Sequence, residues 1–294
     1  MKIKLSPGEI IFNTFNYLFM VFIVLVMLYP LLYVLFASLS DPARLMATRG
    51  LLLGPLGFHL DAYKLVFDNP SILIGYRNTL FYVTAGTFIN VLMTALGAYV
   101  LSRRNLMFRR PISLLMVFTM FFSGGLIPTF LLVGRTLGWM DNPLAILIPG
   151  AISTVNLIIM RTAFEGLPYE LEEAARMDGA NDFHILFRIV LPLSMPVVAV
   201  MILFYAVAHW NSYFPAMVYL RTRDLYPLQI FLRDILISNS TDSMMTGVSS
   251  SDQMPIGETI KYATIIVATV PILLIYPFLQ RYFVKGVMIG AVKE

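Results

Sequence analysis

The sequence lacks cysteine and has few charged residues. None of its 294 residues is a cysteine, which excludes structural disulfides and thiolate metal sites. Only 13% of the residues are charged, whereas soluble domains average about 25%. The hydrophobic share is 58% and falls into long runs, so we predict an integral membrane protein. The net charge of +4 is better explained by membrane topology than by binding to nucleic acid.

Motifs of several functional classes are also missing. No GxxxxGK[ST] phosphate loop occurs, so an activity driven by ATP would need a separate ATPase chain. No HExxH motif occurs, and the three histidines fall in different predicted layers, so no shared metal site is expected. The predicted spans contain no carboxylate of the kind that marks proton relays, which disfavours a proton-coupled secondary carrier.

Six long apolar runs predict an all-α, polytopic membrane protein. The predicted spans are 15–38, 78–101, 112–134, 143–163, 194–213 and 259–279. Lysines near the N-terminus and four arginines within 102–111 place both segments in the cytoplasm. Alternation then places 39–76 and 214–257 outside and both termini in the cytoplasm. Ser123, Gly124, Gly125 and Pro128 predict a kink or local unwinding in the third span.

The most polar segment between two long apolar runs is 168–196. Pro168 and the glutamates that follow favour the start of a helix. Gly179 can end that helix with a positive φ, and Asn181 can cap the next one. The segment therefore predicts a short helix, a sharp turn and a second helix that leads back into the membrane. Leu171, Ala174 and Ala175 are expected to share one face that lies close to another surface.

The order and spacing of seven residues within 168–196 resemble the EAA loop of binding-protein-dependent ABC importer permeases. The matching residues are Glu173, Ala174, Ala175, Gly179, Ile189, Leu191 and Pro192. In that family the loop forms a cytoplasmic coupling helix that docks in a cleft of the ATPase subunit. The resemblance implies such a helix between spans 4 and 5, with ATPase coupling at Glu173, Ala174, Ala175, Asp178, Gly179, Ala180, Leu191 and Pro192. The alternative is an ordinary amphipathic helix between two spans.

Further motifs resemble carbohydrate-uptake permeases of the maltose-permease superfamily. They are 122–128 (FSGGLIP), 209–211 (HWN), 225–229 (LYPLQ) and the ending at 281–293. They are similar to the subgroup that handles complex oligosaccharides and polysaccharides, which includes lipopolysaccharide-type and alginate-type permeases. The whole chain, 1–294, is then expected to be a single permease domain in the bacterial cytoplasmic membrane, with a cytoplasmic tail at 280–294.

The resemblance implies a set of partners. These are a second permease that completes a heterodimer, two ATPase subunits, an extracytoplasmic solute-binding protein, an oligosaccharide substrate and the lipid bilayer. The chain itself is expected to be no enzyme and to bind no cofactor, because ATP and Mg belong to the partner ATPase. The tail is expected at the ATPase interface, and 239–253 at the binding protein or as a disordered connector. Alternatives are an ABC permease for an amino acid or polyamine, a secondary carrier, and a membrane-embedded enzyme.

Neutral polar residues inside the predicted spans are candidates for a solute path. They are Asn90, Ser123, Asn156, Trp210 and Asn211. Amides and hydroxyls suit a hydroxyl-rich solute, and an aromatic face suits stacking on a sugar. The alternative is hydrogen bonding between helices, which such residues commonly supply in membrane bundles. Trp210 is also explained as an anchor at the membrane interface.

Overall fold

A computed structural model of the chain describes residues 6–48, 50–237 and 253–291. Throughout these ranges the regular elements are helices and no strand occurs, which confirms the prediction of an all-α protein. The chain divides into two compact units. The smaller unit contains 1–70 and 232–269, and the larger contains 71–231 and 270–294.

The smaller unit is built on one long apolar helix, α1 (Pro7–Ser38). Ser6 caps it and Glu9 completes the capping box. Two short helices follow, α2 (Pro42–Ala47) and α3 (Asp61–Asp68). None of the residues in the most apolar window of α1 is buried within the chain, so this helix leaves a large apolar surface for lipid or for another subunit.

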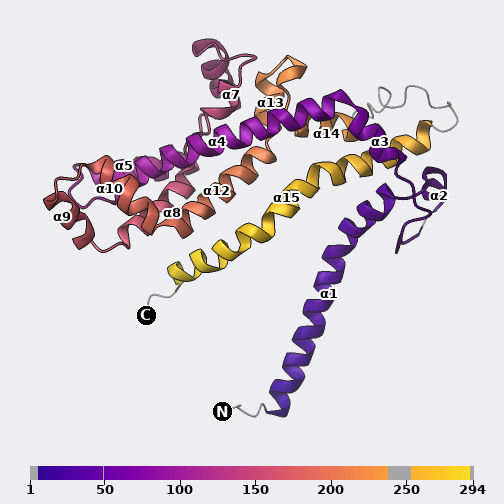
Figure 1. The fold of residues 1–294 in the computed structure, drawn as a ribbon, viewed down its shortest axis with the longest axis horizontal. Coiled ribbons are helices and arrows are strands. Elements are labelled where there is room, and N and C mark those ends of the chain that lie inside the picture. Colours follow the sequence, from indigo (N-terminus) through magenta and orange to yellow (C-terminus); the bar gives the residue numbers. More distant parts are fainter. Residues whose placement is uncertain (1–5, 49, 238–252, 292–294) are drawn as a thin grey trace. The chain divides into compact units, whose positions relative to one another are not determined.

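The larger unit is organised along α4 (Pro70–Ser102) (Figure 1). The later elements are α5 (Arg109–Phe121), α6 (Leu126–Phe130), a π-helix (Leu131–Thr136), α7 (Leu144–Leu147), α8 (Thr154–Glu165), α9 (Glu170–Met177), α10 (Asp182–Ile185), a second π-helix (Leu186–Val190), α11 (Leu191–Leu193), α12 (Met195–Trp210), α13 (Phe214–Tyr219), a 3-10 turn (Arg223–Leu225) and α14 (Leu228–Ile237). The last helix is α15 (Gln253–Ala291), and both α14 and α15 have residues in each of the two units.

Three helices are long and apolar enough to cross a membrane. They are Pro7–Ser38, Pro70–Ser102 and Ile256–Ile275, and they contain the first and second predicted spans and most of the sixth. Two bent pairs, Arg109–Phe121 with Leu126–Thr136 and Asp182–Leu193 with Met195–Trp210, raise the number to five if each pair is one span. The described residues therefore confirm a polytopic helical membrane protein with three to five candidate spans.

Two predicted spans are interrupted. Residues 122–125 are not helical, and the axes on either side of them differ by 108°, a larger break than the predicted kink. The prediction of one continuous helix over 143–163 was wrong, because 148–153 separate α7 from α8. Pro149 lacks a backbone N–H and Gly150 has a high conformational entropy in the unfolded chain, so both disfavour a helix there.

Two boundaries also differ from the expectation. The helix that contains the second predicted span begins at Pro70, before the predicted start at residue 78. The last helix does not end at residue 279 but continues through most of the predicted tail to Ala291. The final three residues of that tail and the expected binding-protein contact at 239–252 lie outside the described residues.

Side chains of α4 bind the segment that contains the LYPLQ motif. Asn78 Nδ2 donates to the carbonyl oxygens of Asp224 at 2.6 Å and Tyr226 at 3.0 Å. The Tyr82 hydroxyl, also from α4, donates to the Leu225 carbonyl at 2.9 Å. These hydrogen bonds fix the segment against α4, since buried backbone polar groups need partners.

We expect Asn78→Ala to destabilise the permease by about 1–3 kcal/mol, because two carbonyl oxygens lose their donor. Thermal unfolding in detergent measures this as a lower melting temperature. Leu80→Ala is the matched control on the same helix, because the Leu80 side chain is exposed. An equal effect of both substitutions would contradict this role for Asn78.

Candidate functional site

The EAA-like segment forms a helix that closes with a Schellman motif. α9 has three glutamates in its first turn, where the helix dipole favours negative charge. At its end, the Gly179 N–H donates to the Arg176 carbonyl at 3.0 Å and the Ala180 N–H donates to the Ala175 carbonyl at 2.9 Å. Gly179 has a φ of 81°, which confirms the predicted positive-φ turn.

The second helix begins as the sequence predicts. The Asn181 side chain accepts from the His184 N–H at 2.8 Å and caps α10. The Tyr99 hydroxyl donates to Asp182 Oδ1 at 3.1 Å, and Arg176 Nη2 donates to the same oxygen at 2.6 Å. These contacts tie the turn between α9 and α10 to the end of α4.

α9 has one buried face and one exposed face. The sequence predicted one shared face for Leu171, Ala174 and Ala175, but Ala175 is buried in the apolar cluster that α4, α8 and α10 share, whereas the other two residues are exposed. The physical reason is the 100° step between successive helical residues, which turns Ala175 away from Ala174. Leu171 and Ala174 are exposed, and the side chain of Met177 is 88% exposed. α9 therefore presents Leu171, Ala174 and Met177 outward.

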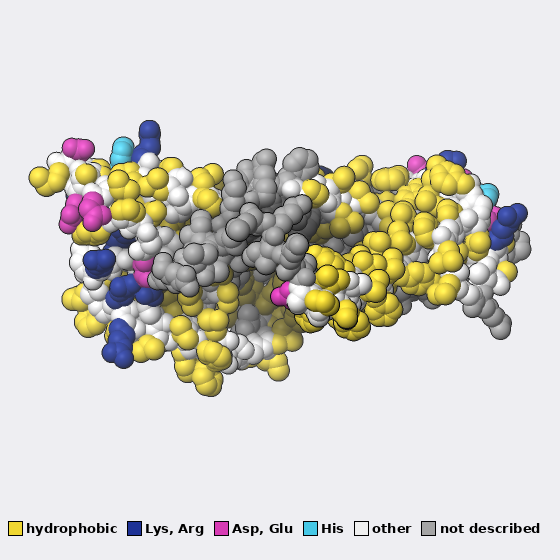
Figure 2. Space-filling model, turned by 90° about the horizontal axis from the view of Figure 1, so that it is seen from below, with side chains coloured by type: hydrophobic (Ala, Val, Ile, Leu, Met, Phe, Trp, Pro, Cys, Tyr) yellow, Lys and Arg dark blue, Asp and Glu magenta, His cyan; other side chains and the backbone are white. Residues whose placement is uncertain are grey.

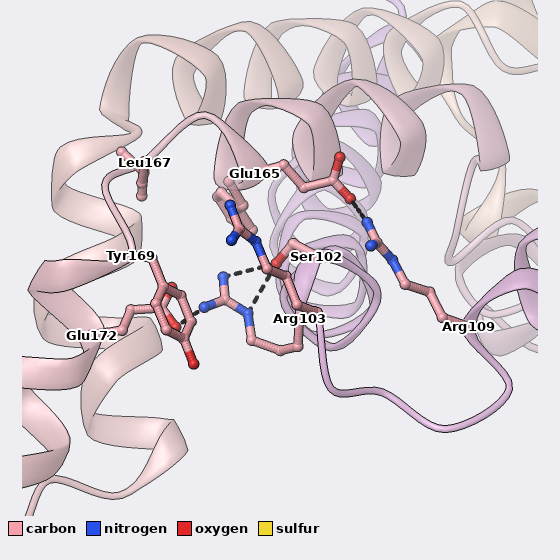
Figure 3. A pocket seen from close by; sticks show the side chains of 9 residues that line it. Ser102, Arg103, Arg109, Glu165, Leu167, Tyr169 and Glu172 are labelled. Atoms are coloured by element: carbon pink, nitrogen blue, oxygen red, sulfur yellow. Dashed lines mark hydrogen bonds and ion pairs between the residues drawn. The ribbon is translucent and has the colours of Figure 1, made fainter.

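The buried face of α9 also contains a carboxylate. Glu172 forms an ion pair with Arg103, which follows the last residue of α4 (Figure 3). The two side chains are only 6% and 12% exposed, respectively. Arg103 Nη2 also donates to Ser102 Oγ at 2.8 Å, and its guanidinium lies 4.4 Å from the centroid of the Tyr99 ring. Burial lowers the pKa of Arg103, and the Glu172 carboxylate compensates the desolvated charge.

A second ion pair lies beside the first. Arg109 pairs with Glu165 at the end of α8 (Figure 3). Arg161 Nε donates to the same carboxylate oxygen at 2.8 Å. Arg109 Nε also donates to the Leu101 carbonyl at 3.0 Å. The arginine-rich loop was predicted only as a signal of membrane orientation. In the structure, two of its arginines also bind α8 and α9. The acidic residues at 165–173 were the signal in the sequence that could have predicted this pairing.

These charges are concentrated at one end of the larger unit. Figure 2 shows Lys and Arg side chains beside Asp and Glu side chains at the end where α9 lies. Hydrophobic side chains cover much of the remaining visible surface. This division fits a polar, water-exposed end that follows apolar membrane-spanning segments.

A separate cavity of about 620 Å³ lies in the same unit, where both helix breaks occur. It is lined by Asn90, Ser123, Gly125, Leu126, Thr129, Ala145, Ile146, Pro149, Gly150, Ser153, Asn156, Phe204, Tyr205, Ala208, His209, Ser212, Phe214, Pro215, Val218 and Tyr219. Non-helical backbone is tolerated at membrane depth where it lines such a cavity. The two breaks therefore supply polar backbone to this space.

The cavity contains three of the five predicted solute-path residues. Asn90, Ser123 and Asn156 line it, but Trp210 and Asn211 do not. Trp210 is buried, and its ring lies 6.3 Å from that of Tyr76 in an edge-to-face pair. Asn211 is exposed. Trp210 and Asn211 therefore lie outside the lining of this cavity, whereas the preceding residue of α12, His209, lines it.

Two hydrogen-bond networks cross the cavity wall. Asn90 Nδ2 donates to the Gly150 carbonyl at 2.6 Å, and Asn90 Oδ1 lies 2.6 Å from His209 Nε2. The Tyr205 hydroxyl lies 2.7 Å from Thr94 Oγ1 and accepts from the Ser153 N–H at 3.1 Å. Sequence reasoning missed His209 and Tyr205 as lining residues. Their i, i+4 spacing on an apolar helix was the available signal.

The Asp141 carboxylate fixes the segment that follows α13. It accepts from the Thr222 hydroxyl at 2.6 Å and from the backbone N–H groups of Thr222 at 2.9 Å and Arg221 at 2.8 Å. These hydrogen bonds, the Thr222 hydroxyl first, lower the pKa of Asp141. In the described part of the chain, no three His, Asp or Glu side chains are grouped so that they could bind a metal ion.

We expect Glu172→Ala to destabilise the permease by about 3–5 kcal/mol, because Arg103 would remain as an uncompensated buried charge. Unfolding of the purified subunit in detergent measures the loss. The reversed pair, Arg103→Glu with Glu172→Arg, should recover part of it.

Glu173→Ala is the matched control for Glu172→Ala, because Glu173 is exposed on the next position of the same helix. This control should leave the melting temperature close to that of the unmodified protein. Equal stability of the two alanine variants would show that the Arg103–Glu172 pair does not fix α9.

Comparisons with known proteins match nearly the whole chain. Residues 8–289 match the family described as "Binding-protein-dependent transport system inner membrane component". The chain is 41% identical over 283 residues to the polygalacturonan/rhamnogalacturonan transport system permease protein YtcP of Bacillus subtilis, with 96% of this chain and 98% of that protein covered. It is 27% identical over 298 residues to the arabinooligosaccharides transport system permease protein AraQ of the same organism, with 98% of each chain covered.

A solved structure is also similar. One chain of a bacterial ABC transporter involved in the import of the acidic polysaccharide alginate superposes with a TM-score of 0.86 at 35% identity. The match covers 95% of this chain and 99% of that one. The resemblance inferred from the EAA-like loop is thus confirmed, and the ATPase of such systems is a separate subunit. The chain belongs to the family of inner membrane components of binding-protein-dependent transport systems, as a multi-pass permease.

Proposed function

We propose that this chain is the permease subunit of an ATP-driven importer for oligosaccharides or polysaccharide fragments. The cavity carries this proposal, because its lining combines amides, hydroxyls and aromatic rings. Of the described residues around it, none is Asp, Glu, Lys or Arg. Such a lining suits a hydroxyl-rich solute. The similarity to permeases named for polygalacturonan, rhamnogalacturonan and arabinooligosaccharides supports the same substrate class.

The coupling end of the proposed mechanism is α9. Its outward residues Leu171 and Ala174 would enter a cleft of the ATPase, and the exposed Glu173 would pair with a cation there. Asp178, Gly179 and Ala180 shape the end of the helix, and Leu191 and Pro192 return the chain to the membrane. The buried Ala175 has a different role, because it seats α9 on the apolar cluster of the permease.

Motion at α9 would reach the cavity through α4. Arg103 joins the end of this helix to Glu172, and Asn90 and Thr94 lie on its cavity side. Asn90 and Thr94 lie within the continuous helix Pro70–Ser102, and Arg103 follows its last residue. Displacement of α9 on ATP binding would therefore displace α4 relative to Gly150 and His209, and so change the shape of the cavity.

The proposed assembly contains this chain, a second permease, two ATPase subunits and an extracytoplasmic solute-binding protein. The chain would form one permease domain, 1–294, with both termini in the cytoplasm and a coupling loop at 168–196 between the fourth and fifth of six spans. The fourth of these six spans is the interrupted segment from α7 to α8, which is additional to the five candidates described above. The tail at 280–294 would lie at the ATPase, and 239–253 would contact the binding protein.

We expect Glu173→Ala or Gly179→Val to abolish solute-stimulated ATP hydrolysis in the reconstituted importer without preventing membrane insertion. Glu173→Ala removes an exposed charge from the docking face, and Gly179→Val forces a β-branched residue into a left-handed conformation. ATPase activity is measured with the solute-binding protein loaded with an oligosaccharide.

Glu170→Ala is a control for Glu173→Ala, because Glu170 is also exposed but lies a full turn away. Its stimulated ATPase activity should stay near that of the unmodified importer. Full stimulation in both Glu173→Ala and Gly179→Val would refute coupling through this loop. Stimulation by an amino acid or a polyamine, and by no sugar, would instead favour a non-sugar permease.

The proposed topology predicts opposite accessibility for two exposed positions. Because the chain has no cysteine, Asn105→Cys and Arg223→Cys each introduce a single reactive thiol. An impermeant thiol reagent should label residue 223 in intact cells and residue 105 only after the membrane is permeabilised. The reverse pattern would contradict the proposed orientation.

A further inference from the structure

The cavity has one basic side chain that can accept a proton and become a cation. This is His209, and no carboxylate is present among the described residues that line the cavity. The remaining polar lining comes from neutral amides, hydroxyls and backbone. A positive charge on His209 would therefore have no counter-ion in the lining of this space, and an anionic group of a solute could supply it.

The hydrogen bonds of Asn90 determine which nitrogen of His209 is protonated. The Gly150 carbonyl can only accept, so the Asn90 amide nitrogen, 2.6 Å away, must face it. Asn90 Oδ1 then faces His209 Nε2, also at 2.6 Å, and Nε2 must donate. In the neutral ring this leaves Nδ1 as an acceptor, which can take up a proton from water and then donate to a solute.

The position of the ring is fixed by α4. Gly86 lies against it, and a Cβ at this position would overlap three atoms of the imidazole. The absence of a side chain at Gly86 lets the ring approach α4 closely enough to reach Asn90. Asn90 is buried and therefore has little freedom to move away from the imidazole. The imidazole is thus held in one orientation at the cavity wall before any solute arrives.

We propose that His209, positioned by Asn90 and Gly86, binds the carboxylate of a uronic-acid unit as an acidic oligosaccharide passes through this cavity. This inference rests on the proposed import of oligosaccharides and narrows its substrate class. A carboxylate near Nδ1 favours the protonated imidazolium, while the Nε2–H bond to Asn90 remains in place. Two of the similar proteins are named for transport of polygalacturonan or of the acidic polysaccharide alginate, which is consistent with an anionic solute.

The test compares one oligogalacturonide with its methyl ester, which has the same sugar units without the charge. Uptake of both is measured in vesicles that contain the complete importer, using ester preparations that load the solute-binding protein. For His209→Gln we expect the ratio of acid uptake to ester uptake to fall by about tenfold or more, as for the loss of a hydrogen bond to a charged group. His59→Gln is the control, because His59 lies outside the lining of this cavity, and it should leave the ratio unchanged.

A second variant keeps the test decisive if His209→Gln fails to insert. Asn90→Asp has nearly the same shape but adds a carboxylate that would pair with the imidazolium and repel the solute, so the ratio should again fall. An unchanged ratio in both inserted variants, or equal loss of acid and ester uptake, would overturn the proposal and leave His209 as a contact between α4 and α12. Failure of the unmodified importer to transport either solute would instead contradict the proposed function.

Discussion

The buried ion pair between Arg103 and Glu172 constrains the rest of the larger unit. Neither charge can be removed singly without leaving the other desolvated, so α9 and the end of α4 have one favourable relative position. The Schellman motif at Gly179 then fixes the turn into α10, and Tyr99 fixes Asp182 at its start. Together these contacts hold α9 in a fixed position against the end of α4. In this account, α4 transmits the force that coupling requires.

The connection between α9 and α4 matters for the proposed transport because α4 also contacts the wall of the cavity. Asn90 hydrogen-bonds both to Gly150, in one helix break, and to His209, on α12. Broken helices place polar backbone around the cavity, and the intact α4 passes beside it. A rigid helix next to interrupted ones concentrates conformational change at the breaks, since their backbone lacks a continuous hydrogen-bond ladder.

Local patterns in the sequence predicted the helical class, the positive-φ glycine and the Asn181 cap, because each depends on neighbouring residues. The same reasoning missed Ala175 as a buried residue and the pairing of Arg103 with Glu172, because both depend on packing between elements far apart in the chain. The break at 148–153 was also missed, although Pro149 and Gly150 disfavour a helix. The fourth span was predicted from the mean hydropathy of a long window, which hides two single residues. Asn90, Ser123 and Asn156 were found from their polarity in apolar runs, whereas His209 was found only from its orientation on α12.

The central claim is that α9 and the end of α4 move as one body. Spin labels at Glu170→Cys and Asn105→Cys, both exposed positions in a chain without cysteine, report the distance between α9 and the arginine-rich loop by pulsed electron paramagnetic resonance. The reconstituted importer is measured without nucleotide and with ATP trapped at the ATPase. The account predicts the same distance distribution in both states. A distribution that shifts when ATP binds would show that α9 moves independently of α4 and would contradict the account.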